Sequence, residues 1–170
     1  MAKSSFPFTP DAAANALLAR DGTALLIGMC LDQQVRTEKA FSSPFVLRER
    51  LGHIDARKIA ATPPAKLDKI FRTPPALHRF PGMMAKRVRQ LCKIIAEDYG
   101  NRGANVWKRA KTADDLYARL RALPGFGEGK AVVGVHVLAK FGGIKPTGWR
   151  RYANEQALPW EFKSGKKITA

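Results

Sequence analysis

The sequence is poor in cysteine. Cys30 and Cys92 are the only two among 170 residues, which excludes both a disulfide framework and a Cys-x-x-Cys metal motif. Both lie in apolar, helix-like surroundings, which indicates two reduced, buried thiols. Apolar runs long enough to cross a bilayer are also lacking, and residues 1–6 contain no apolar signal-peptide core. We therefore expect a soluble, cytoplasmic protein.

Acidic residues are scarce as well. Only 14 Asp and Glu stand against 30 Lys and Arg, so the formal net charge is +16. A surplus this large creates a positive field, and the commonest partner of such a field is a polyanion. No stretch joins a basic face to a deeply apolar one, as a helix that lies on a lipid surface does. The charge balance therefore favours nucleic acid over a membrane.

Strand-like alternation and internal repeats are lacking too, and the hydrophobic periodicity is helical throughout. The segment 24–33 is nearly all apolar, so we expect it to be a buried, central helix. Thr112 and Asp115 form a capping-box pattern. The sequence predicts an all-α protein whose helices cover residues 9–20, 24–33, 39–51 (with a break at Pro44 left open), 55–61, 65–71, 84–99, 112–122 and 127–141.

A hairpin motif, Leu123-Pro124-Gly125-Phe126-Gly127, lies between the last two of these helices. Its glycines permit a tight turn and a close approach by a neighbouring backbone. The helix that follows presents free N–H groups, and Lys130 lies on its first turn, so the segment suits a phosphate. Such contacts bind the nucleic-acid backbone rather than reading its sequence. An ordinary turn between two helices is the alternative interpretation.

Three landmarks occur in a characteristic order: Leu31-Asp32-Gln33-Gln34 after the buried helix, Phe80-Pro81-Gly82-Met83-Met84-Ala85-Lys86-Arg87 before a basic helix, and the hairpin with Ala131 behind it. With these, residues 24–142 resemble the helix–hairpin–helix (HhH-GPD) DNA glycosylase superfamily, which includes endonuclease III and the alkylpurine glycosylases. The resemblance implies an all-α, two-lobed helical fold with the cleft for DNA and base between the lobes. It implies one domain, 1–170, with a helical core at about 23–142, the helix–hairpin–helix at 113–141, and a second lobe from 1–22 plus 143–170.

The resemblance also assigns roles to single residues. A glycosylase flips its target base out of the stack and fills the gap, and Gln33 matches the glutamine that fills it. Phe80 lies near the position of a wedge on the opposite strand, with Pro81 and Met83 as competitors. A capping Gln33 and a core Phe80 are the plainer alternatives. The residues assigned to DNA contact are Gln33, Phe80, Gly125, Phe126, Gly127, Gly129, Lys130 and Arg150.

Two features of bifunctional and cluster-containing relatives are missing. Relatives that use a lysine nucleophile carry it two residues after the last hairpin glycine, where this sequence has Gly129. Lys130 is one residue further, and one residue turns a helical side chain by about 100°. The sequence therefore predicts no lyase activity, although a one-residue shift in alignment would restore the lysine. An iron–sulfur cluster needs four cysteines near the C-terminus, so no cofactor is expected; a monovalent cation at the hairpin is left open.

The family's catalytic aspartate is missing as well. Its position falls within Thr147-Gly148-Trp149, and no aspartate follows Asp115. Trp149 there suits stacking on an extruded base, or plugs the end of the helical barrel, and Arg150 suits a phosphate. Gln34 and Trp149 are assigned to the base pocket.

We expect Asp32 to replace the missing acid, because a partly desolvated carboxylate has a raised pKa. It alternatively accepts a hydrogen bond from the base edge, caps its helix or pairs with Arg36. Of the histidines, His136 is expected in the core, and His53 and His78 at the surface or in loops.

These features together predict a monofunctional DNA glycosylase that acts on double-stranded DNA as a nucleoid-associated monomer. The expected substrate is an alkylated purine such as methylated adenine, since a positively charged base leaves with little acid assistance. The alternative is a catalytically inactive protein that binds damaged or distorted DNA.

Overall fold

A computed structural model describes residues 5–163 and 166–168 of the chain. The described residues form nine α-helices, two 3-10 helices and a small antiparallel ribbon. The all-α prediction is confirmed; the ribbon, in which Glu161 pairs with Ile168, is the one departure from it. The elements are α1 (Ala12–Arg20), α2 (Gly22–Leu31), α3 (Thr37–Leu51), α4 (Ala56–Ala61), α5 (Pro64–Arg72), α6 (Pro81–Asp98), α7 (Asn105–Lys108), α8 (Ala113–Arg121), α9 (Glu128–Gly142), η1 (Trp149–Tyr152), η2 (Glu155–Ala157), β1 (Glu161–Lys163) and β2 (Lys166–Ile168).

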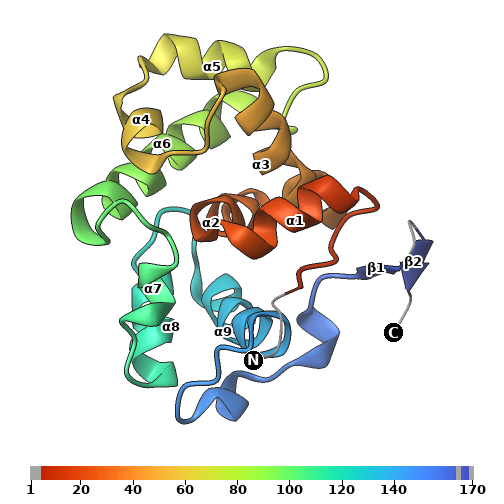
Figure 1. Cartoon of the computed structure of the whole chain (residues 1–170), viewed down its shortest axis with the longest axis vertical. Helices are drawn as coiled ribbons and strands as arrows, with labels where there is room; N and C mark the ends of the chain where they lie inside the picture. Colours follow the sequence, from red (N-terminus) through yellow and green to blue (C-terminus); the bar gives the residue numbers. More distant parts are fainter. Residues whose placement is uncertain (1–4, 164–165, 169–170) are drawn as a thin grey trace.

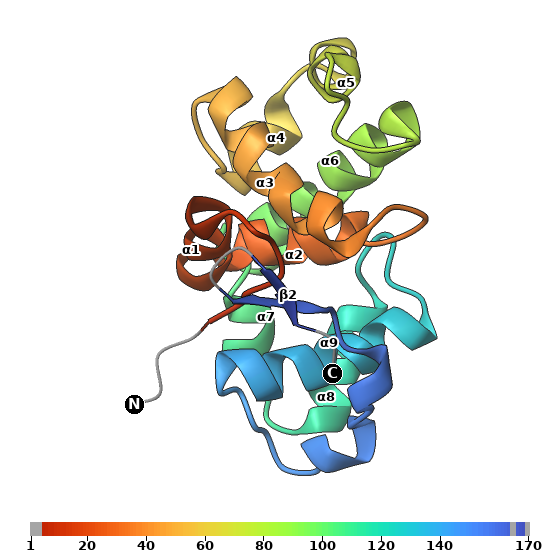
Figure 2. The same cartoon turned by 90° about the vertical axis from the view of Figure 1, so that its right-hand side faces the viewer.

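Helix α2 lies at the centre of the molecule. Helices α3 to α6 gather on one side of it, and α7 to α9 on the other (Figures 1 and 2). All residues from Thr23 to Leu31 are buried, as a nearly all-apolar sequence predicts. Both groups of helices enclose α2. The turn that follows α2, which begins at Asp32, therefore lies between the two groups.

The helix ends follow local side-chain chemistry. Asp21 caps α2 by accepting a hydrogen bond from the Ala24 amide. At α8, Thr112 accepts from the Asp115 amide (3.1 Å) and Asp115 accepts in return from the Lys111 amide (3.0 Å), a reciprocal cap of the kind the sequence predicts. These caps fix where the helices start.

Two helices contain proline. Helix α3, for which the sequence leaves a break at Pro44 open, continues through this residue because it packs on α1, α2 and α5, and this packing outweighs the lost backbone hydrogen bond. Helix α6 begins at Pro81, three residues before the predicted start at residue 84. Proline fits the first turn of a helix, where the missing N–H has no intrahelical partner.

The two ends of the described chain meet beside α9. The Ser5 amide donates to the Phe141 carbonyl (3.1 Å), and the Phe162 amide donates to the Pro7 carbonyl (2.6 Å). The predicted grouping of 1–22 with 143–170 as a second lobe stays a prediction, and its residues 1–4, 164–165 and 169–170 lie outside the described part. Among the described helices none alone is long and apolar enough to cross a membrane; α1 and α2 pass that test only as a pair bent by 116°.

Candidate nucleic-acid interface

The hairpin between α8 and α9 is seated on the end of α2. Gly125 has a φ of +83°, and a Cβ there would lie 3.0 Å from Cys30 Sγ and 3.1 Å from Arg87 Cδ. Both the left-handed backbone and the close approach therefore require glycine. The Cys30 thiol also donates a weak hydrogen bond to the Pro124 carbonyl (3.6 Å). The hairpin is thus held at a fixed place beside the last turn of α2.

The other two glycines have no such role in the fold. Gly127 and Gly129 are exposed, and a Cβ at either position would meet nothing within 4 Å. No side chain caps α9, so the first amides of this helix are bare. Phe126 differs from both, because its side chain is only 3% exposed and anchors the hairpin in the core. Any contact of Phe126 with DNA is therefore through its backbone, not its ring.

Three donors converge on the last turn of α2. The Cys30 carbonyl accepts hydrogen bonds from Lys130 Nζ and from Gln33 Nε2, both at 3.0 Å. Arg87 of α6 donates to Gln33 Oε1, also at 3.0 Å. Carbonyls at a helix C-terminus lack intrahelical partners and carry partial negative charge, which attracts cations. The Cys30 carbonyl of α2 and the side chains of Gln33, Arg87 of α6 and Lys130 of α9 are joined here in one network.

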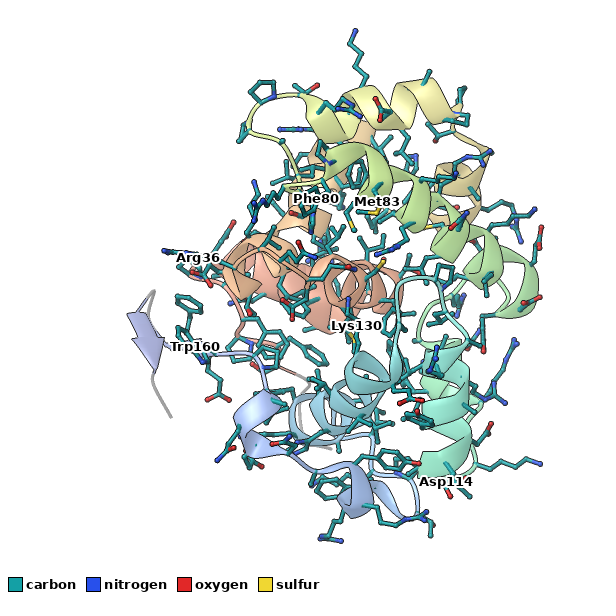
Figure 3. The ribbon with its side chains drawn as sticks, turned by 180° about the vertical axis from the view of Figure 1, so that it is seen from behind. Arg36, Phe80, Met83, Asp114, Lys130 and Trp160 are labelled. Carbon is teal, nitrogen blue, oxygen red and sulfur yellow. The ribbon has the colours of Figure 1, made fainter. Side chains whose placement is uncertain are left out.

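Lys130 points into this network rather than out to solvent. Its side chain is half-buried, and Nζ lies 5.7 Å from the centre of the Phe126 ring and within hydrogen-bonding distance of α2 (Figure 3). Burial lowers the pKa of the amine, and the nearby Cys30 and Asp32 partly offset that effect. Although Lys130 lies one residue beyond the position of the lysine in bifunctional relatives, its flexible four-carbon side chain therefore reaches the end of α2.

Asp32 follows α2 as its C-terminal cap residue and is half-buried. Burial raises the pKa of its carboxyl group, while Lys130 and a hydrogen bond with Thr37 act in the opposite direction. The ion pairs among the described residues do not join Asp32 to Arg36. The structure thus places a desolvated carboxyl group and a desolvated amine close enough to influence each other.

His78 lies in a loop, one of its two expected positions, but it is buried there, with a side chain only 2% exposed. Its Nδ1 accepts from the Phe80 amide (3.0 Å), which leaves Nε2–H to donate to the Leu31 and Gln33 carbonyls (3.1 and 3.0 Å). Burial lowers the pKa of the imidazole. His78 therefore fixes the turn that carries Asp32 and Gln33 against the start of α6. His136 is buried as expected, and His53 lies in a loop and is half-exposed.

The wedge candidates lie on the α6 side of the cleft (Figure 3). Phe80 is half-buried, with the Arg79 guanidinium 5.4 Å from its ring centre. Met83 is 50% exposed, and its sulfur lies 3.9 Å from an Arg87 nitrogen. Met83 is therefore the more available apolar side chain of the two. Gln34, assigned to the base pocket, is exposed in a left-handed conformation with φ of +54°.

The fold does not place Trp149 and Arg150 beside Asp32. The Trp149 ring stacks on His136 with centroids 6.2 Å apart, and the Arg150 guanidinium lies 4.9 Å from its centre. Thr147 pairs with Thr112 at the start of α8. The start of α8 is its end remote from the hairpin, and Figure 3 shows Asp114 there, far from Lys130. After Gly143 ends α9, the chain follows α8 instead of returning to α2, which leaves the expected aspartate position outside the cleft.

A different tryptophan lies near Asp32. Trp160 faces Arg36 (Figure 3) and lines a recess of about 420 Å³ together with Val35, Thr37 and Glu38. The Thr37 side chain also lies near enough to the Asp32 carboxyl group to lower its pKa, so the recess adjoins the end of α2. The sequence analysis missed Trp160, because an irregular C-terminal segment has no periodicity from which to place it.

Metal ligands do not gather in the described part of the chain, where no three His, Cys, Asp or Glu side chains form a cluster. The cation at the hairpin stays a prediction. Cys30 and Cys92 are both free and buried, as expected.

The hairpin between α8 and α9 is thus seated on the central helix, beside the uncapped start of α9 and near both the Asp32 carboxyl group and the Lys130 amine. Residues 27–162 match the HhH-GPD superfamily of base excision DNA repair proteins, and the chain belongs to this superfamily. No protein of curated function matches it.

Among solved structures, the chain is similar to an endonuclease III trapped as a covalent intermediate with DNA, in an estranged-adenine complex. The two are 21% identical with a TM-score of 0.51, and the match covers 73% of this chain and 49% of that one. The fold is therefore endonuclease III-like, and this chain spans about half the length of that protein.

Proposed function

We propose that this HhH-GPD protein excises a modified base from double-stranded DNA by flipping the base and hydrolysing its N-glycosidic bond. The supporting observation is the pairing of Asp32 and Lys130 beside the hairpin. The carboxyl group has a raised pKa and the amine a lowered one, both because of burial. Burial that raises the pKa of a carboxyl group makes its ionised form a stronger general base.

Each part of the site has a step in this reaction. The bare amides at Gly127 and Gly129 receive a DNA phosphate. Gln33 and Met83 occupy the gap that the extruded base leaves. The Asp32 carboxylate then takes a proton from a water molecule as the water oxygen bonds to C1′ of the sugar. The N-glycosidic bond breaks, and the base leaves with the bonding electron pair.

The substrate class that suits this site is an alkylated purine, such as methylated adenine. Such a base carries a positive charge, and its departure neutralises that charge without a proton from the protein. A site that lacks the family aspartate and offers one carboxylate is better matched to this leaving group than to a neutral, stable base. Asp32 then needs only to activate water.

The test is base release from duplexes that each carry one modified base, detected by alkaline cleavage of the resulting abasic sites. We expect release from alkylated-purine duplexes, and a ~10²–10⁴-fold slower single-turnover rate for Asp32→Asn, the usual range for loss of a general base. Binding to undamaged duplex should stay within about 3-fold. Tight binding without release from any duplex would overturn the proposal and leave a protein that binds distorted DNA.

A second candidate function rests on Lys130. Its Nζ lies in the cleft with a lowered pKa, as an amine nucleophile requires. In that reaction the Nζ lone pair attacks C1′, the base leaves with the bonding pair, and the opened sugar forms an imine with the lysine.

Borohydride distinguishes the two routes, because it reduces the imine to a stable protein–DNA adduct. Hydrolysis predicts no adduct with the wild-type protein. An adduct that Lys130→Gln abolishes, and that Lys93→Gln on the exposed face of α6 retains, would establish the lysine route instead.

A further inference from the structure

The C-terminal segment carries an exposed aromatic side chain to the turn between α2 and α3. Trp160 is 53% exposed, although Leu158 and Pro159 just before it are buried. It lines the recess of about 420 Å³ with residues 35–38 of the turn between α2 and α3. This volume lies within the range of small-molecule pockets, roughly 300–1,000 Å³. The recess therefore has room for one purine.

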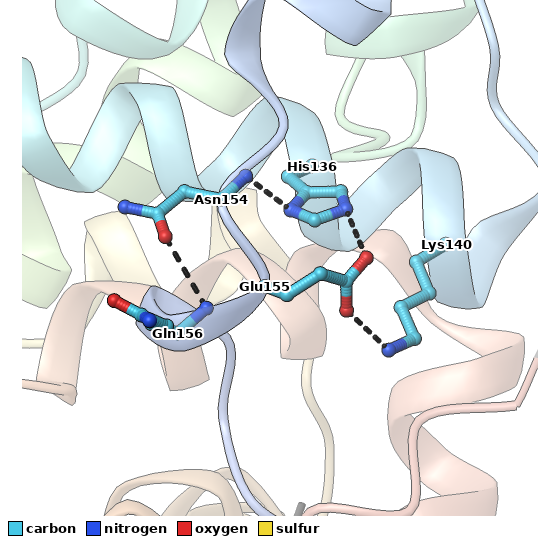
Figure 4. A network of polar contacts seen from close by, with 5 residues as sticks. All are labelled: His136, Lys140, Asn154, Glu155 and Gln156. Atoms are coloured by element: carbon cyan, nitrogen blue, oxygen red, sulfur yellow. Dashed lines mark hydrogen bonds and ion pairs between the residues drawn. The ribbon is translucent and has the colours of Figure 1, made fainter.

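The segment is fixed on both sides of Trp160. Before it, buried His136 accepts from the Asn154 amide at Nδ1 (2.9 Å) and approaches Glu155 Oε1 with Nε2 (3.3 Å), while Lys140 holds the other Glu155 oxygen at 2.8 Å (Figure 4). After it, the Phe162 amide donates to the Pro7 carbonyl at 2.6 Å. The chain on both sides of Trp160 is thus anchored to α9 and to the N-terminal segment.

The lining groups suit a cationic aromatic ring. An indole face is the strongest aromatic partner for a cation and also stacks on flat bases. Glu38 adds a carboxylate to the recess, and Thr37 links it to Asp32. Arg36 is exposed at the same recess, where a guanidinium is available to the phosphate of the extruded nucleotide.

We propose that Trp160 is the stacking surface for the extruded base, and that the recess it forms with Thr37 and Glu38 selects positively charged alkylated purines. This inference rests on the proposed function and replaces Trp149 by Trp160 as the tryptophan of the base pocket. It makes the C-terminal segment part of the substrate site rather than a cover over α9.

Tryptophan fluorescence tests the recess without any reaction. At pH 6, the nucleoside 7-methylguanosine, which carries the positive charge of an alkylated purine, should quench the emission of the wild-type protein more strongly than neutral guanosine does. Trp160→Phe should lose this quenching, whereas Trp149→Phe, the matched control, should retain it. Quenching that persists in Trp160→Phe, or that is absent from the wild type, would overturn the proposal.

Base release supplies the second measurement. Stacking contributes about 1–3 kcal/mol per base, so Trp160→Ala should slow single-turnover release by roughly 5–150-fold, and Trp160→Phe should restore it to within about 3-fold. Affinity for undamaged duplex should not change. Equal rates for Trp160→Ala and wild type would overturn the proposal.

The two measurements also separate the two proposals. Release without quenching dependent on Trp160 keeps the glycosylase and rejects the recess. Quenching dependent on Trp160 without release from any duplex keeps the recess and rejects the glycosylase.

Discussion

Burial of the Asp32 carboxyl group makes the stability of the folded protein depend on pH. Its raised pKa means that the folded protein favours the protonated carboxyl group more than the unfolded chain does. The group therefore contributes its full stability below the unfolded pKa, near 3.9, and this contribution is lost as the pH rises through the folded pKa. At neutral pH the ionised carboxylate destabilises the fold.

From this we predict that Asp32→Asn raises Tm at pH 7. The difference from wild type should shrink as the pH falls through the folded pKa and vanish below about 4, where the carboxyl group is protonated in both states. Thermal unfolding between pH 3 and pH 8 measures it. A lower Tm for the variant at pH 7 would show that the carboxylate is stabilising and that burial does not dominate its pKa.

Met83 and Phe80 are the two candidates for the wedge, and we expect their substitution to affect base release differently. Met83 is half-exposed on the cleft side of α6, so Met83→Ala should leave Tm nearly unchanged and slow base release by about tenfold, which corresponds to ~1.4 kcal/mol. Phe80→Ala should affect release less, since that ring is half-buried. Fluorescence of 2-aminopurine placed beside the target base reports flipping directly. A larger effect at Phe80 would return the wedge to that residue.

At the scale of elements, the glycines of the hairpin differ in role. We expect Gly125 to be needed for folding, and Gly127 and Gly129 to be needed for DNA binding. Gly125→Ala places a Cβ against Cys30 and Arg87 with a positive φ, at a cost of ~1–2 kcal/mol from the backbone alone. Gly127→Ala and Gly129→Ala meet open space, so their Tm values should match or exceed that of the wild type. Their affinity for duplex should nevertheless fall by about 5–10-fold, since each methyl group blocks a phosphate at the amides.

Thermal unfolding and duplex titration of the three variants check this prediction. Full affinity in Gly127→Ala and Gly129→Ala would show that DNA does not approach the start of α9.

The helices that the sequence predicts are those with a repeated apolar stripe or a capping pattern. Helix α2 follows from its unbroken apolar run, and α8 from its capping box. Helix α7, with four residues, is too short to show a period. The β1–β2 ribbon is equally short, and its strands, Glu-Phe-Lys and Lys-Lys-Ile, are too brief to show an alternation of polar and apolar residues.

The sequence motifs predict part of the candidate site. Asp32, Gln33 and Lys130 meet because the hairpin packs on the end of α2, which the order of the landmarks indicates. Trp149 does not join them, because the path after Gly143 depends on long-range packing against α8. His78 and Trp160 enter through loops, and only tertiary contacts give a loop residue its burial or its place.

At the scale of the whole molecule, the charge of +16 predicts a steep salt dependence. Each phosphate contact releases counterions, with a slope of about −0.9 in log affinity against log salt concentration. If about four or five phosphates are contacted, affinity for undamaged duplex should fall by roughly 10²–10³-fold between 50 and 200 mM salt.

Titrations at several salt concentrations measure the slope, and base release from a saturated complex should stay nearly constant across them. A slope near zero would contradict a phosphate-bound complex.

The two native thiols react too slowly to interfere with the labelling of an introduced cysteine. Burial raises the pKa of both Cys30 and Cys92, so little thiolate forms and disulfide exchange with reagents is slow. A cysteine introduced at Gly129, which is exposed and has open space around it, would therefore react selectively against the native background. Paired with a duplex that carries a thiol tether on its backbone, such a variant would capture the complex covalently while leaving the carboxyl group and the amine of the cleft unmodified.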